Sequence, residues 1–169
     1  MIQHSRFASI IASFLLAASP FLPIALSAET PNITVVAFGD FTTALRSTVK
    51  QVYAQRLPAL LAKRNINAKV INSGVGGSHT GRLIDNARHK RQHALDRFQK
   101  TVRDHKPQVV VIQFGYNDSW VDSGDPDGPS RIPLENYRAN LTYIVKTLKS
   151  DGSRVILMTP NRPKKMLAE

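Results

Sequence analysis

Four short apolar segments along the chain predict buried β-strands. They are residues Ile33–Phe38, Ala68–Ile71, Val109–Phe114 and Val155–Met158. Val109–Phe114 gives the strongest signal, because nearly all of its residues are large and apolar. Apolar runs of this length, without polar alternation, are typical of strands in a sheet that is covered on both faces.

Three longer segments between these strands repeat apolar residues at the spacing of an α-helix. They are Arg46–Arg64, Gln92–His105 and Leu134–Leu148. Pro58 falls inside the first and could kink or split it, and Pro107 ends the second. The third segment presents on one face Tyr137, Leu141, Ile144, Val145 and Leu148. Because strands and helices alternate, the sequence predicts an α/β fold with a parallel sheet and helices on both faces.

The first 28 residues have the layout of a secretory signal peptide. A basic residue near the start precedes the apolar run Phe7–Ser19, and small residues follow before Glu29. Pro20 and Pro23 interrupt the apolar stretch, whereas an uninterrupted membrane span needs ~20 apolar residues. We therefore expect a cleaved leader over residues 1–28, export to the periplasm or beyond, and no stable membrane insertion afterwards. An uncleaved leader acting as a membrane anchor is the alternative.

The composition is that of one globular domain, which we expect over residues 29–169. The chain has 169 residues, of which 42% are hydrophobic, enough to bury a core. It has no cysteine, which excludes disulfides, thiol nucleophiles and zinc sites built from cysteine. We expect neither a cofactor nor a bound metal.

The formal net charge is +11, and much of the excess lies between Arg82 and Lys106. That segment holds eight basic residues against three acidic ones. Such a basic face could attract polyanions, although a solvated helix face is the more ordinary interpretation. Nucleic acid is not an expected partner, because an exported protein does not meet it and the segment lacks the repeated aromatic residues of single-strand binders.

Three polar motifs follow the first three predicted strands. They are Gly39-Asp40-Phe41, Asn72-Ser73-Gly74-Val75-Gly76-Gly77 and Gly115-Tyr116-Asn117-Asp118. Because the carboxyl ends of parallel strands meet at one edge of a sheet, we expect the motifs to share one site. Together they resemble the first three sequence blocks of the SGNH (GDSL-type) hydrolases, a family of serine esterases. The resemblance implies a flavodoxin-like, three-layer αβα fold.

The resemblance also implies a role for five residues. Gly77 would offer its backbone N–H, and Asn117 its side-chain amide, to an oxyanion hole. Asp40 would be a structural hydrogen-bonding residue of the first turn, and Asp118 would tie the third loop together. The nucleophilic serine of the family corresponds to Phe41, whose ring has no oxygen that could attack an acyl carbon.

In the family a further helix and strand follow, and after them an Asp-x-x-His pair that completes the catalytic triad. No Asp-x-x-His follows Met158 in this sequence. We therefore expect the domain to lack its last helix and strand and to be incomplete at its C-terminal end. With the serine, the aspartate and the histidine all missing, we expect negligible esterase activity.

Other side chains near the motifs are candidates to replace the missing groups. The nearby hydroxyls are those of Thr42, Thr43, Ser73, Ser78 and Ser119. We expect Thr42 to point away and none of the five to act as nucleophile. His79 is the best local candidate for a base, and the other histidines are expected to be solvated. His89 and His93 have the i, i+4 spacing of a metal pair, but the basic residues beside them would repel a cation.

Two functions follow from the resemblance. The first is an esterase, impaired as written, for O-acetyl or other carboxylic esters of carbohydrates, since Ile112–Asp118 resembles the rhamnogalacturonan acetylesterase-like branch. Its expected partner is a small-molecule or polysaccharide ester. The alternative is a carbohydrate-binding pseudoenzyme without catalysis, in which Phe41 packs on an acylated sugar. An unrelated nucleotide-binding protein is disfavoured, because His79 stands where the motif Gly-x-Gly-x-x-Gly requires its third glycine.

Overall fold

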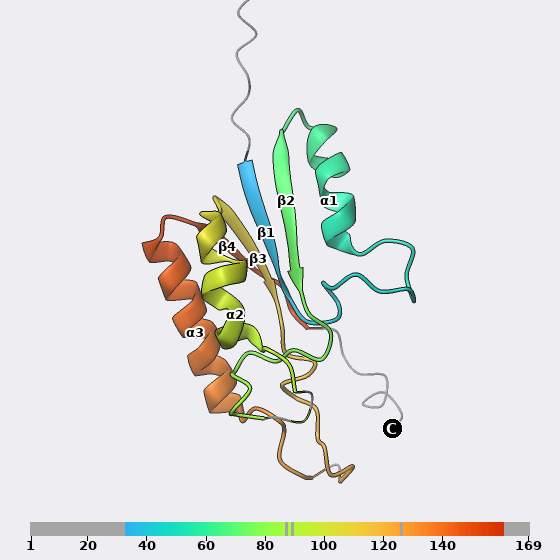
Figure 1. The fold of residues 1–169 in the computed structure, drawn as a ribbon, viewed down its shortest axis with the longest axis vertical. Helices are drawn as coiled ribbons and strands as arrows, with labels where there is room; N and C mark the ends of the chain where they lie inside the picture. The colour runs from blue at the N-terminus through green and yellow to red at the C-terminus, as the bar shows by residue number, and fades with distance from the viewer. Residues whose placement is uncertain (1–32, 87, 89, 126, 161–169) are drawn as a thin grey trace, which may run out of the picture.

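A computed structural model describes residues 33–86, 88, 90–125 and 127–160. Within these residues the chain alternates strands and helices (Figure 1). The strands are β1 (Ile33–Gly39), β2 (Ala68–Gly74), β3 (Val109–Gln113) and β4 (Arg154–Leu157). The helices are α1 (Tyr53–Ala62), α2 (Ala94–Thr101) and α3 (Leu134–Ser150), and the 3₁₀ turn η1 (Arg103–His105) follows α2. The predicted leader lies outside the described residues.

The four strands form one parallel sheet in the order β2-β1-β3-β4. β1 is central, since its residue Val36 pairs with Ile71 of β2 on one side and Val110 of β3 on the other. β4 completes the sheet through pairs such as Val110 with Val155. β2 continues beyond its predicted end at Ile71 to Gly74, because its last three residues still pair with β1. The predicted α/β fold with a parallel sheet is confirmed.

Helices α2 and α3 cover one face of the sheet, and α1 covers the other (Figure 1). The main core lies beneath α2 and α3 and contains the buried residues Val36, Phe38, Ala94, Phe98, Val102, Val110, Ile112, Phe114, Ile144 and Leu148. A smaller cluster of Ala37, Val52 and Ala54 packs α1 against β1. Because both faces of β1 are covered, its sequence is apolar without alternation.

Two of the predicted helices are shorter than the sequence suggests. α1 begins at Tyr53 rather than Arg46, and the side chain of Gln55 caps it by accepting a hydrogen bond from the Val52 N–H at 3.0 Å. Pro58 lies inside α1 without splitting it. The second predicted helix divides into α2 and η1, whereas α3 begins where predicted. No helix in the described residues is long and apolar enough to cross a membrane.

β4 forms one edge of the sheet and is sparsely covered. Val155 packs against the main core, but Ile156, on the opposite face, is 51% exposed. The next residue, Leu157, is 54% exposed. Ile156 is exposed because α1 packs against β1 and β2 on its face and leaves β4 uncovered there. The described part of the sheet therefore presents an apolar edge strand.

Candidate functional site

The loops that follow β1, β2 and β3 meet at one end of the sheet, the lower end in Figure 1. The Asp40 N–H donates to the Gln113 oxygen at 3.2 Å, and the Val75 N–H donates to the Gly39 oxygen at 3.0 Å. The loop after β1 then crosses Gly74, where a Cβ would lie 2.2 Å from a backbone nitrogen of that loop. Only glycine allows this approach. The three motifs predicted from the sequence thus lie side by side.

Asp40 holds the turn after β1. Its buried carboxylate accepts hydrogen bonds from the backbone N–H and the hydroxyl of Thr42, at 2.8 and 2.7 Å. Its backbone oxygen accepts from the Thr43 N–H at 3.1 Å. Burial raises the pKa of Asp40, and the bonds from Thr42 and the charge of Arg46 oppose that rise. These bonds fix the backbone on either side of Phe41.

Phe41 lies at the end of β1 with its side chain half-buried. Its ring meets the Tyr116 ring edge-on, with centroids 4.9 Å apart and planes at 77°. The Arg46 guanidinium lies 5.7 Å from the centroid of the Phe41 ring and donates to the Phe41 oxygen. Gly76 passes beside it, since a Cβ there would lie 3.8 Å from the Phe41 Cβ. Gly77 has a φ of 74°, in the left-handed region that favours glycine.

Two buried side chains of the third motif, Asn117 and Asp118, form hydrogen bonds with residues that follow the second motif. The Asn117 Nδ2 donates to the Ser78 oxygen at 2.9 Å, which orients the amide and uses one of its two hydrogens. Asp118 accepts from the Thr80 N–H at 2.8 Å, the Thr80 hydroxyl at 2.5 Å and the Gly115 N–H at 3.1 Å. Burial raises the pKa of Asp118 to about 6, although these hydrogen bonds oppose the rise.

Arg97 is a buried member of the site that the sequence interpretation missed. It is 3% exposed and lies beneath the loops after β1 and β2. One guanidinium nitrogen donates to the oxygen and hydroxyl of Ser73 at 2.6 and 3.1 Å. The other donates to the Gly39 oxygen at 2.9 Å and the Ser78 hydroxyl at 3.5 Å. The guanidinium also lies 4.6 Å from the centroid of the Phe38 ring. Burial lowers the pKa of Arg97 to about 10.

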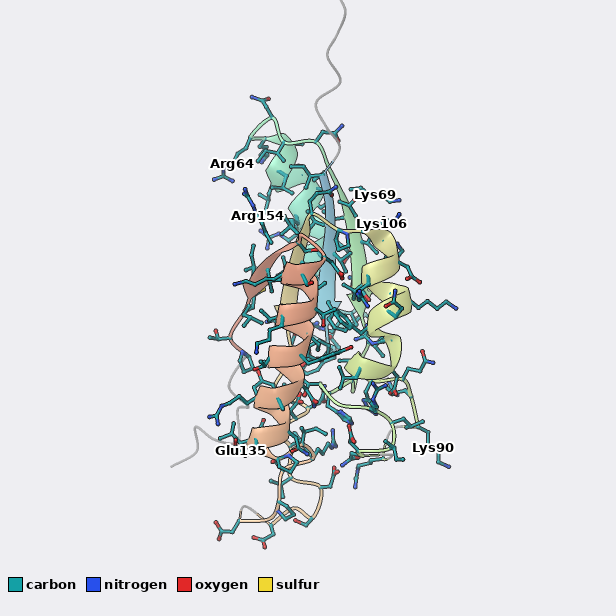
Figure 2. The ribbon with its side chains drawn as sticks, turned by 90° about the vertical axis from the view of Figure 1, so that its left-hand side faces the viewer. Arg64, Lys69, Lys90, Lys106, Glu135 and Arg154 are labelled. Carbon is teal, nitrogen blue, oxygen red and sulfur yellow. The ribbon has the colours of Figure 1, made fainter. Side chains whose placement is uncertain are left out.

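Most basic residues between Arg82 and Lys106 are exposed, in keeping with the interpretation as a solvated face, and Arg97 is the exception. Lys90 lies near the site end of the molecule and Lys106 at the opposite end (Figure 2). Arg97, between them in sequence, is inside. A signal for this was available, since Arg97 is three residues after Ala94 and next to Phe98, both on the buried side of α2.

The family described as GDSL-like Lipase/Acylhydrolase matches residues 37–168, which include all three motifs and β2 to β4. The chain belongs to this family. The resemblance to the SGNH hydrolases, predicted from the motifs, is confirmed. The family also accounts for the fold, because a solved lipase/acylhydrolase structure has a similar fold.

Relatives of this GDSL-like protein are longer than the chain. An uncharacterized lipoprotein of Bacillus subtilis, YqeF, is 33% identical over 129 residues, which cover 74% of this chain and 47% of the lipoprotein. The lipase/acylhydrolase structure from Enterococcus faecalis is 29% identical with a TM-score of 0.58, covering 77% and 58% of the two chains. A variant of an acetylxylan esterase from Geobacillus stearothermophilus shares the fold at 24% identity and a TM-score of 0.59, covering 76% and 59%. The chain thus spans less than two thirds of each.

The hydroxyls near Phe41 each have a structural place in this GDSL-like fold. The Thr42 hydroxyl donates to Asp40 at 2.7 Å, and the Ser119 hydroxyl donates to the Tyr116 oxygen at 3.2 Å. The remaining candidates are buried beneath the loops: Thr43, Ser73 and Ser78. A nucleophile needs its oxygen directed toward a base and an open site. Thr43, Ser73 and Ser78 are thus inside the protein, and the hydroxyls of Thr42 and Ser119 are bonded within their own turns.

His79, the predicted candidate for a base, lies in a buried pair of stacked histidines. Its ring centroid is 3.5 Å from that of His93, with the planes at 10°. Its Nδ1 accepts from the Gly81 N–H at 3.1 Å, so we assign the proton to Nε2, which donates to the Asn86 oxygen at 3.4 Å. Burial lowers the pKa of His79. The prediction that His93 is solvated is wrong, because it is fully buried at the start of α2.

No three histidine, aspartate or glutamate side chains of the described residues gather in an arrangement that could hold a metal ion. His89, the partner of His93 in the predicted metal pair, lies outside the described residues. What the loops present instead is amide hydrogens, aromatic rings and guanidinium groups.

Proposed function

We propose that this GDSL-like domain binds carbohydrate esters and hydrolyses them poorly or not at all. One observation carries the proposal: the loops that would hold an ester are tied together, while the residue at the nucleophile position is Phe41. The Asn117 amide is already oriented by its bond to Ser78. By resemblance to the family, this amide and the N–H groups of Phe41 and Gly77 would receive an acyl oxygen.

The chemistry of acyl transfer explains the expected impairment. The reaction begins when a nucleophilic oxygen attacks the acyl carbon while a base removes its proton. Phe41 supplies no such oxygen, and both ring nitrogens of His79 are engaged with the backbone. Loss of a serine nucleophile typically lowers turnover by about 10⁶, whereas loss of one oxyanion donor costs about 10²–10³. The missing nucleophile therefore outweighs the donors that remain.

The proposed ligands are O-acetyl or other carboxylic esters of carbohydrates. Support comes from the sequence Ile112–Asp118, which resembles the rhamnogalacturonan acetylesterase-like branch, and from the acetylxylan esterase that shares the fold. The second candidate, a pseudoenzyme that only binds sugars, is favoured by the half-buried ring of Phe41 packed on Tyr116. Both candidates use the same loops and differ in residual turnover.

We also propose that the protein is exported. The layout of residues 1–28 supports a secretory leader, and the relative from Bacillus subtilis is described as a lipoprotein. An exported domain would meet polysaccharide esters outside the cell. Fractionation of cells that produce the full chain tests this, because a protein found only in the cytoplasm would contradict it.

Two measurements test the function. Hydrolysis of p-nitrophenyl acetate by the chain should not exceed that of a Phe41→Ala variant, and faster hydrolysis would refute the impairment. Calorimetric titration with an acetylated xylo-oligosaccharide should show binding that Asn117→Ala weakens about fivefold, the effect of one hydrogen bond. The matched control is Asn136→Ala, an exposed asparagine of α3. Absence of any binding would overturn both candidate functions.

A further inference from the structure

Residues 78–81, which follow the second motif, bond alternately to two different parts of the protein. The first and third of them bond to the third motif. The Ser78 oxygen accepts a hydrogen bond from the Asn117 amide at 2.9 Å, and the N–H and hydroxyl of Thr80 both donate to the Asp118 carboxylate. The amide that is proposed to receive an acyl oxygen is therefore oriented by the backbone of this short segment.

The second and fourth residues of the segment bond to the start of α2 instead. The His79 oxygen accepts from the Ala94 N–H, and the Gly81 oxygen accepts from the Leu95 N–H, both at 3.0 Å. The His79 N–H donates to Nδ1 of His93 at 3.2 Å. Residues 78–81 thus join the third motif to the first turn of α2.

The stacked rings of His79 and His93, which we call the histidine pair, are held in one protonation state by these bonds. Each Nδ1 accepts a backbone N–H, that of Gly81 for His79 and that of His79 for His93, at 3.1 and 3.2 Å. A nitrogen that accepts a hydrogen bond carries no proton, so each ring is neutral with its hydrogen on Nε2. A second proton could bind only at Nδ1 and would break one of these bonds. Two charged rings would also repel each other at a centroid separation of 3.5 Å.

The charges around the histidine pair come from three parts of the chain. Burial is the main reason that the pKa of His79 is lowered, and Arg131, before α3, acts in the same direction. A backbone hydrogen bond and the carboxylates of Asp85 and Asp96 oppose it. Asp96, on α2, also accepts the His93 N–H at 2.9 Å. Because folding lowers this pKa, the closed arrangement is fully favoured above the ordinary histidine pKa of about 6.5 and loses that advantage as the pH falls below it.

Two further charged groups touch residues 78–81. The Arg97 guanidinium lies 3.5 Å from the Ser78 hydroxyl, and with a pKa of about 10 it stays charged in neutral and acidic solution. Asp118, bonded to Thr80, has a pKa raised to about 6, so acid favours the closed arrangement at this carboxyl. Its effect is opposite in sign to that of the histidine pair.

We propose that the histidine pair positions the Asn117 amide and releases it in acid. With both rings neutral, residues 78–81 are held on α2, and the Ser78 oxygen orients the amide. A proton on either Nδ1 breaks one of the bonds that hold the segment and frees it from the helix. The consequence for the ligand rests on the function proposed above, whereas the release itself does not.

Hydrogen exchange of the amides of residue 79 and Gly81, which donate to the histidine pair, tests the release. Exchange rates corrected for the chemical effect of pH give an opening constant. The variant combines His79→Asn with His93→Asn, because an asparagine oxygen takes about the place of Nδ1 and asparagine suits both tight turns and the start of a helix. Below about pH 6.5, the opening constant of the parent should rise relative to that of the variant by up to tenfold per pH unit for each ring.

The comparison separates the histidines from the other groups that titrate. Asp118 is present in both proteins and cancels in the ratio of the opening constants. Each single variant should retain about half of the difference in slope, since one ring still titrates. His105→Asn, at an exposed histidine of η1, is the control and should follow the parent.

An acetylated xylo-oligosaccharide tests the connection to the site. A ligand that needs the oriented Asn117 amide binds the closed arrangement, so at about ten times its dissociation constant it should lower the opening constant about tenfold. The Arg64 amide, which donates to the Leu61 oxygen at the far end of α1, is the control and should exchange at the same rate with and without the sugar (Figure 2).

The outcomes distinguish this inference from the proposed function. Equal pH slopes in the parent and the double variant would overturn the release. Different slopes, with a sugar that binds but does not slow exchange at residues 79 and 81, would overturn the positioning role. If no sugar binds, the proposed function fails, and the pH slopes still decide whether the histidine pair releases the segment.

Discussion

The charged groups beneath the site differ from those around its opening. Beneath it, Arg97 and Asp118 are buried, and each is hydrogen-bonded to two or more segments of backbone. Around the opening, Arg91 is exposed, and Arg46 stands beside the half-buried Phe41. A buried charge that loses its partners has no water to replace them, whereas an exposed one does. The buried layer should therefore govern the fold and the opening should govern the ligand.

Phe41 lies at the boundary between these two regions. Its backbone belongs to the turn held by Asp40, and its ring faces Tyr116 at the opening. The ring of Phe41 therefore forms part of the opening without taking part in any hydrogen bond beneath it. The turn held by Asp40 does not require a hydroxyl at this position.

The largest effect is expected at Arg97. In Arg97→Met the oxygen and hydroxyl of Ser73 lose this buried donor, the Gly39 oxygen keeps only the Val75 N–H, and each unpaired buried group costs about 1–3 kcal/mol. Denaturant unfolding should therefore show a loss of about 3 kcal/mol or more. Lys100→Met, an exposed cation on the same helix, is the control and should unfold like the parent. A loss at Arg97 as small as that of the control would show that the buried network is dispensable.

Arg97 also marks the limit of what the sequence could predict. The strands and α3 were predictable because apolar spacing is a local property of the chain. The start of α1 was not, since the residues after Arg46 have helical spacing but pack as turns. The buried position of Arg97 depends on Ser73, 24 residues away, and on Gly39, 58 residues away. Local rules place an arginine in solvent, and only the folded sheet brings these oxygens together.

The next effect is a pH dependence at Asp118. Its pKa is raised from 3.8 to about 6. Between these pH values, the Asp118 carboxyl therefore carries a proton in the folded state but not in the unfolded chain. The stabilisation is thus complete below about pH 3.8 and disappears as the pH rises through about 6. The contribution that is lost is about 3 kcal/mol. Asp118→Asn cannot titrate, so its stability should fall less than that of the parent over this interval.

Urea unfolding of both proteins between pH 4 and pH 7 provides the measurement for Asp118. The difference in free energy of unfolding between parent and variant should shrink as the pH rises. The carboxylates of Asp122 and Asp151, which pair with arginines, have lowered pKa values, which act in the opposite direction. They are present in both proteins and cancel in the difference. Parallel pH profiles would show that Asp118 keeps its charge in the fold.

A smaller effect on stability is expected at Phe41. Phe41→Ala removes a half-buried ring and its contact with Tyr116, and such aromatic pairs contribute about 0.5–1.5 kcal/mol. No hydrogen bond of the turn involves the side chain, so the loss should be about 1 kcal/mol. Sugar binding should decline at the same time, because the ring proposed to pack on the sugar is lost. Thermal unfolding and titration on the same sample separate the two effects. A loss of stability as large as that of Arg97→Met would place Phe41 with the buried layer instead.

The smallest effect is expected at Glu135, at the start of α3 near the site end of the molecule (Figure 2). Its carboxylate pairs with Arg138 at 3.0 Å, but the two side chains are 77% and 65% exposed. Solvent screens such a pair, so Glu135→Gln should change the free energy of unfolding by about 0.5 kcal/mol or less. The Arg131 pair with Asp122, at 2.7 Å and with a nearly buried guanidinium, provides the counterpart, Asp122→Asn. Because water screens this pair less, Asp122→Asn should destabilise the protein more than Glu135→Gln. Equal losses in urea would mean that the distinction between buried and exposed charges fails at the loops.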